Sequence, residues 1–291
     1  MIKDYLKLIR VPQWIKNFFV FVPLLFSLHL FDKDYLILSL KAFIVFSLAS
    51  SFVYVINDII DIEVDKAHPK KKNRPLPSGR IKKSSALILA IVLLLIVLFS
   101  YFFFNAQFIS FLYGFLILNI LYSFYLKHIV ILDIFSIAAG FSIRVLAGAA
   151  VIEVPVSSWL ILTTMFISLF LGVMKRHSEL VQVADSNKVT RKVLAEYSTN
   201  FTNQMATVAA SGVIICYALY TVSQRTVSVF NTENLIYTTP FVVFGIFRYM
   251  YLEYQNNQGE NTTQVMMTDI PMIVTVICYA IVTVLIIYKI I

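Results

Sequence analysis

The stretch LSLKAFIVFSLASSFVYVINDIIDIEVD, from Leu38 to Asp65, begins as an almost uninterrupted apolar run and ends in closely spaced acidic residues. The apolar part is long enough for a helix that crosses a membrane, which needs about 20 such residues. Charges at the edge of a membrane are costly, so the acids that follow need a partner or a function. The stretch therefore predicts a membrane helix that leads into a functional acidic segment.

The same apolar character extends over the whole chain. Of the 291 residues, 59% are hydrophobic and only 14% are charged, and the mean hydropathy is +0.81. These values predict an all-α integral membrane protein, because the apolar runs are too long and too uniform for barrel strands. No linker divides the chain, so residues 1–291 are predicted to form a single domain. Nine transmembrane helices are predicted, at 14–31, 38–60, 84–104, 108–126, 130–150, 156–174, 204–223, 235–251 and 270–288.

The distribution of the positive charges predicts the orientation. Most of the 24 Lys and Arg residues fall on one side when the nine segments alternate across a membrane. The positive-inside rule places that side, and with it the N-terminus, in the cytoplasm. The two long loops, near 61–83 and 175–203, lie on this side. We therefore expect a multi-pass protein of the cell (inner) membrane whose active site faces the cytoplasm.

Three aspartates at the end of the second segment indicate a cation site. If that helix continues, Asp58, Asp61 and Asp65 lie at i, i+3 and i+7 on one face, with Asn57 beside them and Glu63 on the opposite side. Clustered carboxylates repel one another unless a cation lies between them, and hard oxygen ligands suit Mg²⁺. The alternative is a solvated helix end whose acids pair with the following lysines.

A basic segment follows the acids. Lys70 and Arg74 lie in a proline-rich stretch that ends at Gly79, so their positions are restrained. A metal ion beside a basic loop is typical of a diphosphate site. The alternative is that the lysines set the topology and contact anionic lipid, and this interpretation is favoured for Lys82 and Lys83.

Further charged residues lie in or near the apolar segments. Lys175 and Glu179 are four residues apart with Arg176 between them, so they could contribute to a site or form a simple helical ion pair. Lys127 lies in a short turn and Asp133 opens the next helix. Arg144 lies deeper in that helix, where it needs a partner in the bundle or in a wet cavity, and is either functional or part of a buried structural pair.

The motif NDIIDIEVD, from Asn57 to Asp65, resembles the first aspartate motif of the UbiA superfamily of intramembrane prenyltransferases, which also have nine helices. The second aspartate pair of that superfamily is replaced here by KRHSEL, from Lys175 to Leu180. With that difference, the chain is similar to the decaprenyl-phosphate phosphoribosyltransferase branch. The other segments that carry this resemblance are RVPQWIKN (10–17), AHPKKKNRPLPSG (67–79), LKHIVILDIFSIAAGFSIRVLAG (126–148) and FGIFRYMYL (244–252).

This resemblance implies Mg²⁺-dependent transfer of 5-phosphoribose from phosphoribosyl pyrophosphate (PRPP) to a polyprenyl phosphate, with release of pyrophosphate. Residues implied to hold Mg²⁺ and pyrophosphate are Asn57, Asp58, Asp61 and Asp65. Those implied to bind the remaining phosphates and the ribose are Lys16, Lys70, Arg74, Lys127, Asp133, Arg144, Lys175, Arg176 and Glu179. The catalytic residues are expected to be Asp58, Asp61, Lys175 and Glu179. No general base is assigned, and inversion at the anomeric carbon is the mechanistic hypothesis.

Two other functions stay open at this stage. An orthodox prenyltransferase, which moves a prenyl group from a prenyl diphosphate to an aromatic ring, would use the first aspartate motif equally well. A membrane transporter or lipid-binding protein would explain the buried charges, although the chain shows no internal repeat of the kind common in transporters. Membrane lipid is an expected partner and nucleic acid is not. The resemblance also suggests a role in cell wall biogenesis.

Overall fold

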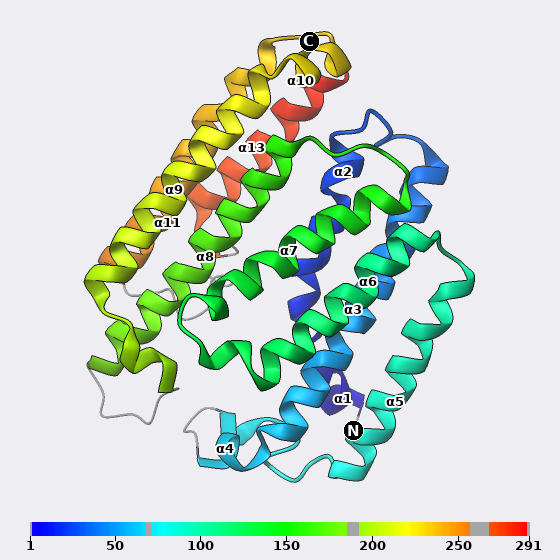
Figure 1. Cartoon of the computed structure of the whole chain (residues 1–291), viewed down its shortest axis with the longest axis vertical. Helices are drawn as coiled ribbons and strands as arrows, with labels where there is room; N and C mark the ends of the chain where they lie inside the picture. Colours follow the sequence, from blue (N-terminus) through cyan, green and yellow to red (C-terminus); the bar gives the residue numbers. More distant parts are fainter. Residues whose placement is uncertain (1, 68–70, 185–191, 257–267, 290–291) are drawn as a thin grey trace. The chain divides into compact units, whose positions relative to one another are not determined.

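A computed structural model describes residues 2–67, 71–184, 192–256 and 268–289 of the chain (Figure 1). Within these ranges all regular elements are helices and none is a strand, which confirms the all-α prediction. The α-helices and the main 3₁₀ helix are α1 (Ile2–Leu8), η1 (Val11–Phe21), α2 (Val22–Leu25), α3 (Lys33–Ile60), α4 (Ile62–Ala67), α5 (Lys83–Phe99), α6 (Ala106–Phe124), α7 (Leu132–Val151), α8 (Ser158–Ala184), α9 (Thr199–Val222), α10 (Gln224–Phe230), α11 (Thr239–Asn256) and α13 (Ile270–Ile287).

The helices confirm a multi-pass membrane protein. Among the described residues, 8 helices are long and apolar enough to cross a membrane, or up to 9 if the bent pair Ile2–Leu8 and Val11–Leu25 forms one span. The predicted continuous helix at 14–31 is wrong in detail, because this segment is the 3₁₀ helix η1 followed by the short α2. Pro12 and Pro23 lack the amide hydrogen that a regular helix needs, and Arg10 has a left-handed backbone with φ 53°.

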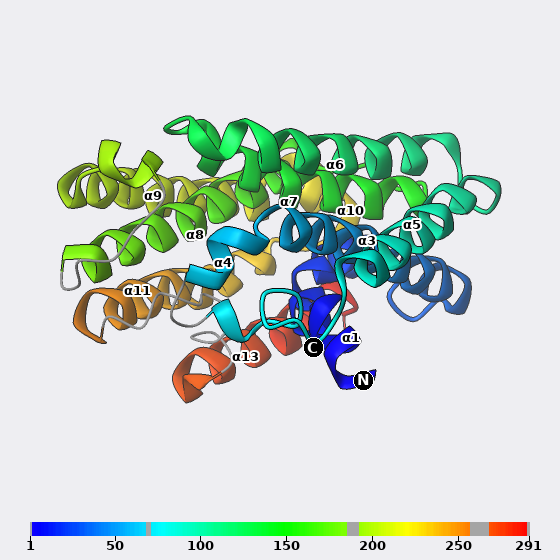
Figure 2. The same cartoon turned by 90° about the horizontal axis from the view of Figure 1, so that it is seen from below.

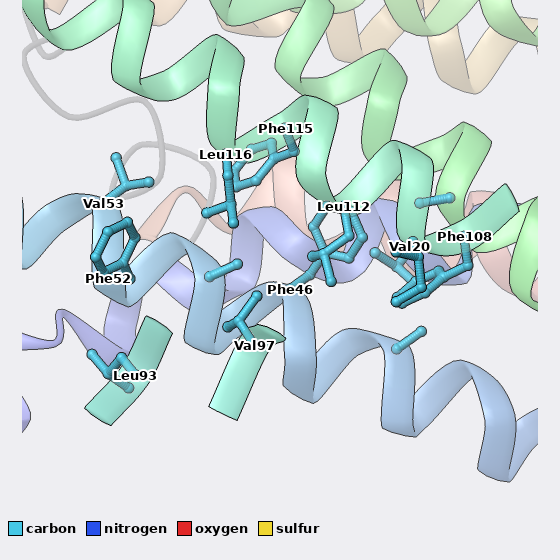
Figure 3. Packing of buried hydrophobic residues seen from close by; sticks show 14 of the residues in the cluster. Val20, Phe46, Phe52, Val53, Leu93, Val97, Phe108, Leu112, Phe115 and Leu116 are labelled. Carbon is cyan, nitrogen blue, oxygen red and sulfur yellow. The ribbon is translucent and has the colours of Figure 1, made fainter. Parts of the chain in front are cut away.

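The chain divides into two compact units, Met1–Phe124 with Ile143–Pro155, and Tyr125–Ser142 with Val156–Ile291. That the whole chain forms a single domain stays a prediction. In the first unit, apolar side chains of α3, α5 and α6 form a continuous core (Figure 3). Phe46 of α3 lies against Phe108 and Phe115 of α6, with ring centroids 5.8 and 5.4 Å apart. This packing holds α3, which carries the acidic residues, in a fixed position.

Polar side chains fix η1 against α3. Asn17 is fully buried, and its amide donates to Ser47 Oγ at 3.1 Å and accepts from Ser50 Oγ at 3.2 Å. The backbone of Val20 also comes so close to Gly148 of α7 that a Cβ there would lie 2.1 Å from the Val20 carbonyl oxygen. Glycine is thus required for the close contact between η1 and α7 at this position.

In the second unit, α8 and α9 lie side by side in both whole-chain views (Figures 1 and 2). Gly212 of α9 makes room for the ring of Phe166 of α8, which would lie 2.5 Å from an added Cβ. Helix α8 continues to Ala184, ten residues beyond the predicted end at 174, because no glycine or proline interrupts the sequence KRHSELVQVA. The charged residues predicted at the end of this helix therefore lie on the helix itself.

Candidate active site

The aspartates after the apolar part of α3 lie in a charged cluster in the first unit, which we call the Asp58 cluster: Arg10, Asp58, Asp65 and Arg74. Arg74 Nη1 donates to Asp65 Oδ2 at 2.6 Å and to Asp58 Oδ1 at 3.3 Å. Arg10 Nη2 donates to the same Asp58 oxygen. Both aspartates are buried, with exposed fractions of 3% and 2%. One guanidinium thus joins two buried carboxylates.

The backbone explains why these two aspartates face the same way. The helix does not continue as predicted, because α3 ends at Ile60 and α4 begins at Ile62. Asp65 N still donates to Asp61 O at 2.8 Å, which preserves the helical register across the break. The shared-face prediction therefore holds for Asp58 and Asp65. Glu63 points elsewhere, with its side chain 82% exposed, and pairs with Lys66 at 2.8 Å.

A compact turn presents Arg74. Ser78 Oγ donates to the Arg74 carbonyl at 2.6 Å, and Ile81 N donates to the Pro75 carbonyl at 3.1 Å. Gly79 ends the turn with φ +75°, a conformation that side-chain-bearing residues rarely adopt. These interactions confirm the restrained basic segment. Lys70, which the sequence also places in it, lies outside the described residues.

A cavity of about 300 Å³ opens beside the Asp58 cluster. Its lining includes the cations Lys7, Arg10 and Arg74, together with the single carboxylate of Asp58. Positive charge therefore exceeds negative charge around it. Such a cavity favours an anionic ligand, and guanidinium groups are well suited to bind phosphate oxygens in pairs.

Asp58 and Asp65 could also serve as metal ligands. Within the described residues, no three His, Cys, Asp or Glu side chains are close enough to form a protein-only metal site. Asp58 and Asp65 do offer two carboxylates that both contact the guanidinium of Arg74. Mg²⁺ commonly binds to one or two carboxylates plus substrate phosphates and water. The donor set therefore fits a metal that arrives with a diphosphate. Asp61 caps the end of α3 and is half-buried.

Arg144 meets a partner inside the first unit, as its depth requires. Its Nε donates to Asn17 Oδ1 at 2.7 Å, and its guanidinium lies 4.5 Å from the ring centre of Phe115. The half-buried ammonium group of Lys16 lies within the fields of Arg144 and Arg10. These three cations raise the positive potential of this unit further.

A second charged cluster lies in the second unit, and we call it the Arg176 cluster: Asp133, Arg176, Glu179 and Tyr197. Arg176 is 1% exposed, and its Nε and Nη1 donate to Asp133 and Glu179 at 2.6 and 2.5 Å. Asp133 is fully buried and also accepts from the Tyr197 hydroxyl at 2.7 Å. Glu179 remains partly exposed, so it is the member of this cluster that a ligand can reach.

Two residues of these clusters were not recognised from the sequence as site residues. Tyr197 connects two loops, because its hydroxyl accepts from Ile131 N at 2.7 Å and donates to Asp133. Burial is the main reason that the pKa of Tyr197 lies above its ordinary value. Arg10 opens the segment RVPQWIKN (10–17) that carries the resemblance, but no site role was predicted for it. No spacing rule could have found either contact, because each joins segments far apart in sequence.

The remaining predicted site residues are half-buried. They are Asn57 on α3, Lys127 in the turn Leu126–His128, and Lys175 on α8. Lys127 and Lys175 belong to the second unit and Asn57 to the first. The structure thus brings Asp58, Asp65 and Arg74 together in one unit, and Asp133, Arg176 and Glu179 in the other.

Comparisons with known proteins agree on one family. The model of the UbiA prenyltransferase family matches residues 18–286. The chain is 33% identical to the decaprenyl-phosphate phosphoribosyltransferase of Mycolicibacterium smegmatis over 77% of this chain and 72% of that protein. The protein of the same name from Mycobacterium tuberculosis is 32% identical over 76% and 74%. The structure of a UbiA homolog from Archaeoglobus fulgidus bound to GPP and Mg²⁺ has a TM-score of 0.70, 16% identity, and 98% of both chains covered.

Proposed function

Because the chain belongs to the UbiA prenyltransferase family, we propose that it transfers 5-phosphoribose from PRPP to a polyprenyl phosphate. The relatives named decaprenyl-phosphate phosphoribosyltransferase support this choice, since each aligns over about three quarters of the chain. The sequence KRHSEL, in place of a second aspartate pair, supports it as well. The substrates, the metal and the orientation in the membrane are all parts of this proposal.

The cavity beside the Asp58 cluster is the observation on which the proposal rests most. PRPP carries a pyrophosphate and a 5-phosphate, so it needs several cations, and Lys7, Arg10 and Arg74 line the cavity. The carboxylate of Asp58 occupies the same wall, where it can share a metal ion with the pyrophosphate. Arg10 and Arg74 both pair with this carboxylate and neutralise it.

Asp58, Asp61 and Asp65 are the residues that would hold Mg²⁺, with Asn57 beside them. When bound, the ion would neutralise negative charge on the departing pyrophosphate. The relative from A. fulgidus was solved with GPP and Mg²⁺, which supports a divalent metal in this role. Arg74 supports the same charge balance from the protein side, because its guanidinium can move from the aspartates to phosphate oxygens without leaving the cluster.

The reaction requires little covalent chemistry from the protein. A lipid phosphate oxygen forms a bond to the anomeric carbon of the ribose while the bond from that carbon to pyrophosphate breaks, and pyrophosphate leaves with the electron pair. The attacking phosphate is already anionic, so no general base is needed. The electrostatic field of Lys16, Arg10 and Arg144 would stabilise the developing negative charge. A single displacement of this kind inverts the anomeric carbon, and retention in the isolated product would contradict it.

The Arg176 cluster has a different role in this proposal. Arg176 and Asp133 are buried, and both are engaged by other protein groups. We assign them a positioning role, in which they hold the partly exposed Glu179 in place to accept a hydrogen bond from a ribose hydroxyl or to orient a lysine. Lys175 and Lys127 are two cations of this unit that would contact a phosphate group of a substrate.

The orientation in the membrane also follows from the substrates. PRPP is water-soluble and made in the cytosol, so its site belongs on the basic, cytoplasmic face of the inner membrane. The polyprenyl chain partitions into the lipid and can reach the protein from within the bilayer.

Binding of PRPP to purified protein tests the role of the cavity. Calorimetry in detergent with Mg²⁺ should show that Arg74→Gln and Arg10→Gln each weaken PRPP binding by about 10- to 100-fold, the size expected for a lost hydrogen bond to a charged group. Arg74→Lys should keep part of the affinity, which separates lost charge from misfolding. The matched control is Lys41→Gln, an exposed cation on α3 outside the cavity. Equal affinity in all these variants would exclude the cavity as the PRPP site.

A further inference from the structure

A second cavity lies in the first unit, with a volume of about 510 Å³. It is formed by the end of α3, the start of α4, the turn after Arg74 and the start of α5. None of its lining residues lines the cavity beside the Asp58 cluster. The second cavity is therefore a separate feature, and the proposed reaction does not account for it.

One part of this cavity is apolar. Ile59, Ile60 and Ile62 line it from the junction of α3 and α4, and Ile60 is 44% exposed. Leu76 and Ile81, which also line it, are each only 5% exposed and belong to the packed turn. The cavity is therefore lined by exposed isoleucine side chains on one side and by buried, packed apolar side chains on the other. Such a surface is favourable for a hydrocarbon chain and unfavourable for water.

The other part of the cavity is cationic. Lys66, Lys82 and Lys83 line it together with one acid, Glu63, which pairs with Lys66 at 2.8 Å. In the part of the chain that the structure describes, the ammonium groups of Lys82 and Lys83 contact no carboxylate. Positive charge thus remains uncompensated at one edge of an apolar cavity.

The depth of the cavity in the membrane follows from the ends of two spans. The span of α3 ends at Ile60, and the span of α5 begins at Lys83. The cavity therefore lies at the level where apolar helices give way to polar residues, which is the level of lipid phosphates in a bilayer. Lysines at this level attract anionic lipids.

From these observations we propose that the cavity binds an anionic membrane phospholipid. The headgroup phosphate lies between Lys82 and Lys83, and an acyl chain covers Ile59 and Ile60. The bound lipid also contacts Leu76, two residues after Arg74, so it stabilises the turn that presents Arg74 to the aspartates. The lipid thereby acts as a structural ligand of the enzyme and not as a substrate.

Native mass spectrometry of the detergent-solubilised full chain tests this proposal. Phosphatidylglycerol is titrated into the wild type, Lys82→Gln/Lys83→Gln and Lys33→Gln/Lys41→Gln. The last variant removes the same charge from exposed lysines on α3, far along the helix from the cavity. Each lysine near an anionic headgroup contributes a factor of about five in affinity, so the first double variant should bind the first lipid about 25-fold more weakly. The control variant should match the wild type.

Three further arms decide between sources of the same phosphate chemistry. Phosphatidylcholine should bind weakly to all proteins, and inorganic phosphate should not displace phosphatidylglycerol. Ile60→Ser, which keeps every charge, should also weaken phosphatidylglycerol binding. Equal weakening in both double variants, displacement by inorganic phosphate, or unweakened phosphatidylglycerol binding by Ile60→Ser would overturn the proposal.

Discussion

Replacement of Gly148 by alanine tests how closely η1 packs against α7 in the first unit. The added Cβ would lie 2.1 Å from the carbonyl oxygen of Val20, 2.9 Å from its carbonyl carbon and 3.1 Å from its Cα. Favourable contacts between heavy atoms lie at about 3.5–4.0 Å, so the overlap exceeds 1 Å. All three atoms belong to the backbone and cannot rotate away. The substitution must therefore displace η1 from its position.

The expected cost follows from opposing effects. Overpacking in a tight core costs about 1–3 kcal/mol, and more when backbone must move. Alanine gains back up to about 1 kcal/mol over glycine through helix propensity. The matched control is Gly114→Ala on α6, where an added Cβ has nothing within 4 Å. This variant should therefore gain the helix-propensity term without any cost of overpacking. We expect the two variants to differ by about 3 kcal/mol in unfolding free energy.

Thermal unfolding in one detergent provides the assay. With about 2–4 °C for each kcal/mol in a chain of this size, Gly148→Ala should unfold about 6–12 °C below Gly114→Ala. It should also lose activity, because Arg144 lies one turn before Gly148 and its hydrogen bond to Asn17 spans the same contact. Equal unfolding temperatures for the two variants would refute the close approach of Val20 and Gly148.

Other substitutions test the charged clusters. Asp58→Asn should abolish turnover while Glu63→Gln leaves it nearly unchanged, because Asp58 lines the cavity beside the Asp58 cluster and Glu63 does not; equal losses, measured as initial rates, would contradict this. Tyr197→Phe should lower the unfolding free energy by about 1–3 kcal/mol, since it removes the hydroxyl that pairs with Oδ1 of the buried Asp133 and with the backbone amide of Ile131; an unchanged denaturation midpoint would speak against these hydrogen bonds. Hydrogen bonding from Arg248 lowers the pKa of Asp269, so its stabilisation is present above about pH 4 and is lost as pH falls further; Arg248→Gln should flatten the fall in unfolding temperature between pH 6 and pH 3, and parallel curves would argue against it.

Much of the fold could be predicted because a long apolar segment is a strong indication of a membrane-spanning helix. The segments that became α3, α5, α6 and α13 were recognised to within a few residues, except for the N-terminal extension of α3 to Lys33. The first segment was not predicted correctly, since its average hydrophobicity hides Pro23, and since Pro12 and the left-handed Arg10 come just before it. Local backbone chemistry thus overrode a pattern that a window of apolar residues could not resolve.

The charged sites were predictable only where they are local in sequence. The spacing of Asp58 and Asp65 on one helical face was sufficient to predict that they lie together, even though the helix is interrupted between them. The distant residues that pair with the buried aspartates of the two clusters were harder to identify. Arg10 lies 48 residues from Asp58, and Tyr197 lies 64 residues from Asp133. Only tertiary packing determines which distant side chains complete such clusters.

Transfer of label from PRPP to a lipid tests the central claim most directly. Purified protein in detergent receives Mg²⁺, a polyprenyl phosphate and PRPP labelled in the ribose, and label is followed into the organic phase with an EDTA control. A parallel reaction contains a prenyl diphosphate and an aromatic acceptor. We predict Mg²⁺-dependent label in the lipid and no prenylated aromatic product. Prenylated acceptor without labelled lipid would contradict the proposal and indicate the orthodox prenyl transfer instead.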